Sequence, residues 1–450
     1  MTPEAAQRGG RRRVARKTGQ RGGRRGVTPT RRHNGVAALC VVALLCAAGA
    51  RGAVLVPMDL TQTDHLKSYG VAYWALEKGY RVEWFLNYRS GSFLVLDGMD
   101  DVRTECRYRG VSWEEPDGAT LAAIYAEIEE ENMEVVLLEK APAIALYAPD
   151  NVQPWDDAVM LALEYAEIPY TVVWDAEVLA GELETYDWLH LHHEDFTGQY
   201  GKFHASFRNA EWYKEQKAYY EGLAREQGFS SVSEHKKASA RAIKEYVRRG
   251  GFLFAMCSAT DSFDIALAAA GVDIVDTPFD GDPPEPGYQT RIDFSKSLAF
   301  TDYTLMPSPN VYEFSDIDMT ESAVLRPEEI DYFTLFEFAA KHDPVPAMLT
   351  QCHVNVVKGF MGQTTSYRRS LVKNHVTVLA DYPGLDEVKY VHGNLGRGTF
   401  TYFGGHDPED YRHLVGDPPT ILSMHKNSPG YRLILNNVLF PAAKKKERKT

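Results

Sequence analysis

Cysteine is scarce in this sequence, and long apolar runs are absent. The 450 residues include five cysteines, of which Cys40 and Cys46 lie in a short apolar run at 36–50. The other three are Cys106, Cys257 and Cys352. An odd number of cysteines so far apart excludes a disulfide framework. A membrane span needs about 20 apolar residues, so the run at 36–50 is too short for one, and there is no second run.

Acidic residues are almost absent from residues 1–53, which hold 12 of the 49 Lys and Arg but one of the 62 Asp and Glu. A basic segment, an apolar run and small residues at its end are typical of a secretory signal. We therefore expect 1–53 to be a signal peptide and the protein to be exported, periplasmic or extracellular, with no stable membrane anchor after cleavage. The alternative is a cytosolic protein with a basic, disordered tail.

Basic charge is also scarce in the rest of the chain. Removing residues 1–53 leaves 37 basic against 61 acidic residues, a net charge of −24. Nucleic-acid binding needs a basic footprint, so we expect no nucleic-acid partner.

Strand-like and helix-like patterns alternate from residue 54 to about 440. Short apolar runs such as "AVLVPM" and "PYTVVW" are followed by segments with helical spacing, such as "DHLKSYGVAYWALEKG". This alternation predicts one α/β domain, opening β-α-β, with a mostly parallel sheet. We expect a helical insertion at about 196–232, a Pro- and Asp-rich loop insertion at 276–330, and a basic tail at 441–450.

The stretch "GGFLFAMCSATDSFDIALAAAG" predicts a strand, a sharp corner at Cys257 and a helix. A helix N-terminus offers N–H groups, from Ser258 onward, that lower a thiol pKa and hold an oxyanion. Cys257 is therefore a candidate nucleophile. Two alternatives remain: a small, buried and inert cysteine, or the start of a degenerate pyrophosphate loop, because "CSATDS" partly matches S-G-G-x-D-S.

A second candidate site follows the strand pattern "TFTYF". Gly405 allows a tight turn that aims His406 at the crevice where parallel sheets bind ligands. Asp407 or Glu409 could hold the tautomer of the imidazole, as the third member of a triad does. The alternative is a loop histidine beside a helix-capping Asp407.

The stretch "DWLHLHHEDF" places His190 and His192 on one face of a strand. This spacing allows a zinc ligand pair, which is the one cofactor that the sequence suggests. We favour a substrate-binding role, shared with the residues that follow: His193, Glu194 and Asp195. Weaker candidates for the same crevice are Gln62, His65 and Arg89.

Two of these stretches, "AIKEYVRRGGFLFAMCSATDS" and "GRGTFTYFGGHDPEDY", resemble the class I glutamine amidotransferase-like superfamily from about residue 155 onward. The resemblance implies a doubly wound, flavodoxin-like sheet and a triad of Cys257, His406 and Glu409. "GGHDPE" looks like the superfamily's G-x-H-P-E with one residue inserted. Over nearly all of the chain after residue 53, "LKSYGVAYWALEKGYRVEWFLNYRSGSF" and "YDWLHLHHEDFTGQYGKF" look like exported bacterial proteins labelled asparagine synthetase B.

Three functions follow from these patterns. The first is a hydrolase of an amide or related acyl bond, in which His406 deprotonates Cys257 and the thiolate attacks a carbonyl. The second is a non-catalytic protein that binds a small molecule or glycan in the same crevice. The third is the glutamine-hydrolysing asparagine synthetase of the family label, which the replaced loop glycines disfavour.

Overall fold

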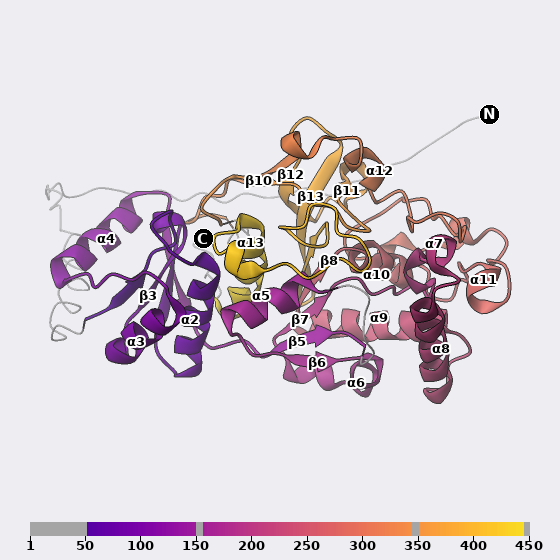
Figure 1. The fold of residues 1–450 in the computed structure, drawn as a ribbon, viewed down its shortest axis with the longest axis horizontal. Helices are drawn as coiled ribbons and strands as arrows, with labels where there is room; N and C mark the ends of the chain where they lie inside the picture. Colours follow the sequence, from indigo (N-terminus) through magenta and orange to yellow (C-terminus); the bar gives the residue numbers. More distant parts are fainter. Residues whose placement is uncertain (1–51, 150–155, 344–350, 445–450) are drawn as a thin grey trace, which may run out of the picture. The chain divides into compact units, whose positions relative to one another are not determined.

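The computed structural model describes residues 52–149, 156–343 and 351–444. The predicted signal peptide therefore lies almost wholly outside the described residues, as do residues 445–450 of the predicted tail. The described chain forms two sheets, one of four strands and one of ten (Figure 1). None of its helices is both long enough and apolar enough to cross a membrane.

The four-stranded sheet has the order β1-β3-β2-β4, and every neighbouring pair is antiparallel. Its strands are β1 (Val54–Val56), β2 (Val82–Leu86), β3 (Ser92–Val95) and β4 (Glu134–Leu138). The accompanying helices are α2 (His65–Glu77), η1 (Tyr88–Ser90), α3 (Met99–Arg109) and α4 (Gly118–Glu130). The predicted β-α-β order is present as β1-α2-β2, but β3 lies between these two strands and pairs antiparallel with both, so the small sheet has no parallel neighbours. The link between β2 and β3 is a five-residue turn, with positive φ at Asn87, Arg89, Ser90 and Gly91, and so short a link can join only antiparallel strands.

The ten-stranded sheet is half parallel. Its parallel strands lie in the order β6-β5-β7-β8-β14. They are β5 (Ile144–Tyr147), β6 (Thr171–Val173), β7 (Trp188–Leu191), β8 (Phe252–Met256) and β14 (Gly398–Phe403). The antiparallel strands are β9 (Tyr332–Leu335), β10 (Val356–Lys358), β11 (Tyr367–Arg368), β12 (Thr377–Asp381) and β13 (Glu387–Leu395). The α/β class is confirmed, but the sheet is mixed rather than mostly parallel.

Both faces of the parallel strands are buried, because alternate residues enter two different cores. Trp188 and Phe254 pack with α5 and α13, whereas Leu189 and Leu253 pack with α9 and α10. The first core is covered by α5 (Ala158–Ala166) and α13 (Pro429–Leu439), the second by α6 (Asp175–Ala180), α9 (Val232–Arg249) and α10 (Ala259–Ala268). Helices on both faces are what a buried parallel sheet requires.

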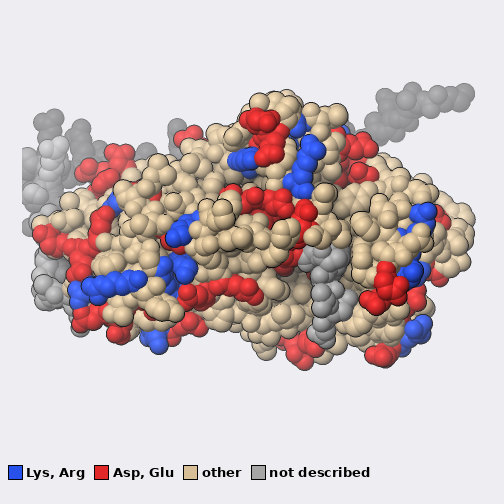
Figure 2. All heavy atoms as spheres, in the orientation of Figure 1, with Lys and Arg blue, Asp and Glu red and all other residues tan. Residues whose placement is uncertain are grey.

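Two insertions extend from the parallel strands. The first contains η3 (Tyr200–Lys202), α7 (His204–Phe207) and α8 (Glu211–Glu226). The second contains α11 (Thr277–Asp280), η4 (Tyr288–Arg291), η5 (Phe294–Lys296), α12 (Thr320–Ala323) and η6 (Glu328–Ile330). The remaining short turns are η2 (Glu182–Thr185), η8 (Arg369–Leu371), η9 (Leu422–Met424) and η10 (Phe440–Ala442). On the face drawn in Figure 2, acidic and basic side chains are interspersed among large neutral areas.

Candidate functional site

The strands β7, β8 and β14 end side by side, and most of the candidate functional residues lie at their carboxyl ends. β7 presents His190 and His192 on one face, as the alternation predicted, with His190 Nε2 at 3.2 Å from His192 Nδ1. Asp157 caps the N-terminus of α5 and places its Oδ1 at 3.4 Å from His190 Nε2 and 3.5 Å from His192 Nδ1. One carboxylate therefore serves both the helix and the two rings.

His406 follows β14 and reaches across β8 to β7. Gly405 has a φ of 93°, and a Cβ there would lie 2.5 Å from the ring of Phe360, so only glycine fits this turn. His406 Nδ1 lies 3.1 Å from His192 Nε2. On its other side the His406 ring stacks on His413, with the ring centroids 4.0 Å apart and the planes 12° from parallel.

His413 extends the group to two further carboxylates. Its Nδ1 lies 2.9 Å from Asp410 Oδ2, and its Nε2 lies 3.5 Å from Asp156 Oδ1. We use the term histidine cluster for His190, His192, His193, His406 and His413 together with Asp156 and Asp157. These residues come from three separate segments of the chain: the start of α5, the end of β7 and the loop after β14.

Burial dominates the electrostatics of the histidine cluster. Burial lowers the pKa of His192 to about 3 and lowers the pKa of His193 and His406 well below the usual value. Burial alone would raise the pKa of Asp157, but the imidazoles of His190 and His192 hold it well below its usual range. Burial also raises the pKa of Glu194 to about 8. Burial therefore favours the uncharged form of the His192, His193 and His406 rings.

Cys257 occupies the corner between β8 and α10. Its φ of 47° is in the left-handed region, where a non-glycine residue is strained. The side chain is 3% exposed, and the backbone N–H of Gln363 donates a hydrogen bond to its Sγ over 3.3 Å. Burial raises the pKa of the thiol to about 11, although the backbone N–H groups of Gln363, Thr364 and Ser258 oppose that rise. Ser258 is itself buried and gives α10 no side-chain cap.

The members of the predicted triad have different neighbours among the described residues. The thiol of Cys257 contacts the loop at Gln363, whereas the ring of His406 contacts His192 and His413. Glu409 Oε2 pairs with His425 Nδ1 at 2.8 Å, and Asp407 accepts a hydrogen bond from the backbone N–H of Glu409. Cys257, His406 and Glu409 are thus close in the fold, but no described contact joins them as a relay. The corner at Cys257 places the thiol against the loop at Gln363. The turn at Gly405 instead directs the His406 ring toward His192 at the end of β7.

The three weaker candidates tie together loops beside the small sheet. The Gln62 side chain donates hydrogen bonds to the backbone oxygens of Pro57 and Ser112. His65 stacks on His353 with the ring centroids 4.5 Å apart. The Arg89 guanidinium pairs with the carboxylates of Asp59, at 2.7 Å, and Glu114, at 2.8 Å. None of these contacts leads to the histidine cluster within the described residues.

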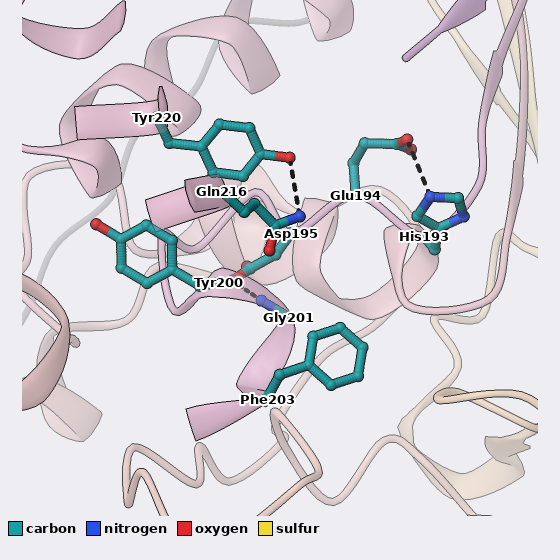
Figure 3. Close-up of a pocket in the computed structure, with 8 residues that line it drawn as sticks. All are labelled: His193, Glu194, Asp195, Tyr200, Gly201, Phe203, Gln216 and Tyr220. Atoms are coloured by element: carbon teal, nitrogen blue, oxygen red, sulfur yellow. Dashed lines mark hydrogen bonds and ion pairs between the residues drawn. The ribbon is translucent and has the colours of Figure 1, made fainter. Parts of the chain in front are cut away.

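A small cavity lies beside the cluster, under the helical insertion (Figure 3). Its volume of about 10 Å³ is close to the least that holds one water molecule. Eight residues line it: His193, Glu194, Asp195, Tyr200, Gly201, Phe203, Gln216 and Tyr220. Asp195 Oδ2 accepts a hydrogen bond from the backbone N–H of Gly201, which fixes the turn under the cavity. The predicted residues His193, Glu194 and Asp195 therefore share one hollow.

Sequence reasoning missed Asp156, Asp157 and His413. The pair of acids in "WDDAVML" directly precedes an apolar stretch with helical spacing, and Asp157 is the N-cap of α5. The signal that could have found it is its position between a parallel strand and the next helix, at the edge where such sheets bind ligands. His413 lies in a loop and has no comparable signal.

No family model matches the chain, and no curated protein matches it. Among solved structures, two cytoplasmic proteins of Salmonella typhimurium align over 68% and 67% of this chain and 100% of their own. Both give a TM-score of 0.33, with 11% and 12% sequence identity. A catalytic mutant of a GH42 beta-galactosidase from G. stearothermophilus aligns over 59% of this chain and 28% of its own, with a TM-score of 0.25 and 12% identity. These values assign the chain to no family.

Proposed function

We propose that this protein binds a small polar ligand at the carboxyl ends of β7, β8 and β14, and that the histidine cluster recognises it. The observation that carries the proposal is the convergence of five imidazoles and two carboxylates from three chain segments. Burying so many polar groups costs free energy unless they are paired. His406 Nε2 has no hydrogen-bond partner among the described residues, although His406 is only 4% exposed.

The strand order supports this location. Numbered along the chain, the five parallel strands lie in the order 2-1-3-4-5, which is the flavodoxin-like order. We infer that this half of the sheet is a flavodoxin-like unit, the fold implied by the resemblance to glutamine amidotransferase-like proteins. In such sheets ligands bind beyond the carboxyl ends of the strands.

The aromatic side chains of the helical insertion favour a small polar ligand over a glycan. A glycan platform needs exposed ring faces, whereas Tyr200, Phe203 and Tyr213 are all buried. Phe203 packs edge-on against Trp212, and Tyr200 against Tyr213. The insertion thus covers the end of β7 instead of presenting a surface.

A thermal-shift panel of amino acids, small carboxylates, phosphates and monosaccharides tests the proposal. A ligand at about 100 times its Kd adds about 2.7 kcal/mol of stability, which corresponds to a shift of several degrees. We expect such a shift for the wild type and its loss in His192→Gln and His406→Gln. His392→Gln is the matched control, because His392 is equally buried but bonds to Thr401. No shift with any class, or equal shifts in all four proteins, would contradict the proposal.

One specific observation favours a second function, a cysteine-dependent hydrolase of amide or acyl bonds. Cys257 has the strained φ of a nucleophile corner, and backbone N–H groups of Gln363, Thr364 and Ser258 face its sulfur. In that reaction the thiolate attacks the carbonyl carbon, the amine leaves with a proton, and water hydrolyses the thioester. The reaction needs a base close to the thiol, so the reactivity of Cys257 decides between the two functions.

A further inference from the structure

We propose that the histidine cluster binds one divalent transition-metal ion, of which Zn²⁺ is the simplest choice, through ring nitrogens of His192, His193 and His406. The inference rests on the proposed function for the location of the site and names the ligand that the site takes. Three histidines with an open fourth position are a known donor set for zinc.

The spacing of two donor atoms fits one ion, and a nitrogen of the third histidine lies near them. One ring nitrogen from each of His192, His193 and His406 lies within 4.8 Å of the other two. His192 Nε2 and His406 Nδ1 are 3.1 Å apart. Two nitrogens bound to tetrahedral zinc at 2.0–2.1 Å are about 3.3 Å from each other. The pair therefore needs a shift of only a few tenths of an ångström to bind an ion.

The ring orientations select these three histidines and exclude His413. The lone pair of an imidazole nitrogen lies in the plane of its ring. The His192 ring is inclined by 87° to His406 and by 78° to His193, so the in-plane lone pairs of these rings can converge. His413 stacks on His406 with the planes 12° from parallel, so these two rings cannot aim lone pairs at one ion.

The surrounding hydrogen bonds orient His192 as a ligand. His190 Nδ1 faces the backbone oxygen of Phe254, at 3.0 Å, so this nitrogen carries the proton. In a neutral His190 ring Nε2 then accepts, and His192 Nδ1 donates to it or to Asp157. His192 Nε2 is left with a free lone pair. A carboxylate behind a ligating histidine, as Asp157 is behind His192, is a usual feature of zinc sites.

A bound ion would also give hydrogen-bond partners to the unpartnered atoms of His406 and Asp156. Without an ion, His406 Nδ1 must donate to His192 Nε2, which leaves a bare lone pair on His406 Nε2. One nitrogen of His406 lies within 4.8 Å of atoms of Asp156 and His413, and neither oxygen of Asp156 accepts a hydrogen bond from the described residues. With Nδ1 on the ion, the same proton sits on Nε2 and faces Asp156. The ring stays neutral, so no proton is released.

The cavity beside His193 offers room for a fourth ligand. His193 and Glu194 line this space, and its volume of about 10 Å³ is close to the least that holds one water molecule. A water there would complete four-coordination, and a small polar ligand could replace it. This arrangement links the ion to the ligand site proposed above.

The test is a titration of the full-length protein, freed of metal by dialysis against a chelator. We expect Zn²⁺ to bind at about one ion per chain, and Co²⁺ to give the visible absorption of a tetrahedral site. His192→Gln and His406→Gln should lower the Zn²⁺ affinity at least about 100-fold, and Asp157→Asn about 10- to 100-fold. His392→Gln, equally buried but outside the cluster, should leave the affinity unchanged.

Folding is controlled by comparing the circular dichroism and Tm of the metal-free proteins. Asp157→Asn keeps the test decisive if a histidine variant does not fold. No Zn²⁺ or Co²⁺ binding below about 10 μM, or equal binding by the variants, would overturn the inference. If no metal ion binds but an organic ligand raises the Tm and His406→Gln removes that effect, the proposed function is supported without the metal site. If a metal ion binds but no organic ligand raises the Tm, only the metal site is supported.

Discussion

The thiol of Cys257 should be almost unreactive in the folded protein. Burial raises its pKa from the ordinary 9.0 to about 11. At pH 8 the thiolate fraction is then roughly 0.001 instead of roughly 0.1, and because only the thiolate reacts, alkylation should be about 100-fold slower. The 3% exposure of the side chain slows the reaction further. This expectation follows from the burial of the sulfur.

The assay is a time course with iodoacetamide between pH 7 and 9.5, in which mass spectrometry reads the peptide of each cysteine separately. The same protein in denaturant gives the ordinary rate for each thiol. We expect Cys257 to label with no midpoint below pH 9.5. Rapid labelling with a midpoint below pH 8.5, shifted upward by His406→Gln, would refute the reasoning and favour the hydrolase.

Three further predictions concern other parts of the chain. Asp264→Asn should lower the free energy of unfolding by about 3–5 kcal/mol in a urea titration. Asp264 accepts three backbone hydrogen bonds from residues 298–300 of the second insertion and one from the Tyr402 hydroxyl on β14, and an amide NH₂ would oppose these donors. A loss below about 1 kcal/mol would contradict this role. Burial lowers the pKa of Lys389 to about 7. Above pH 7 the unfolded chain therefore binds more protons than the folded chain. The free energy of unfolding should rise with pH by up to about 1.4 kcal/mol per pH unit between pH 7.5 and 9.5. Lys389→Met should remove this pH dependence of the free energy of unfolding, even if it also changes the stability at every pH. An unchanged pH dependence in the variant would show that Lys389 is charged in the folded protein. Glu409→Gln should change Zn²⁺ affinity less than twofold, since Glu409 pairs with His425; a loss equal to that of His406→Gln would restore its role beside His406.

The sequence predicted the strands of the parallel half of the large sheet well, because they are short runs rich in apolar and aromatic residues, and several are followed by helices. In the small sheet it predicted the strands "AVLVPM" and "YRVEWFLNY" and the helix between them, but not their pairing. The turn at 87–91 places β3 between β1 and β2, and the apolar pattern does not contain that information. It also missed β13, where Glu387, Lys389 and His392 are all buried. A strand whose polar residues are buried with specific partners cannot be predicted from hydrophobic alternation.

The sequence predicted several residues of the candidate site but not the contacts between them. Strand alternation was enough to place His190 and His192 together, and a glycine pair was enough to aim His406. The direction in which His406 points depends on the neighbouring strand, so the sequence favoured Cys257 as its partner, whereas the structure brings it to His192. Contacts between residues 214 positions apart carry no local signal.

The most direct test of the histidine cluster as the functional site is an anomalous diffraction experiment at the zinc absorption edge. Crystals would be grown from full-length protein with one equivalent of Zn²⁺. We predict a single anomalous peak between His192, His193 and His406, within about 2.0–2.1 Å of a nitrogen of each ring. A map with no peak at the cluster, and with His192 and His406 joined by a direct hydrogen bond, would contradict the metal site.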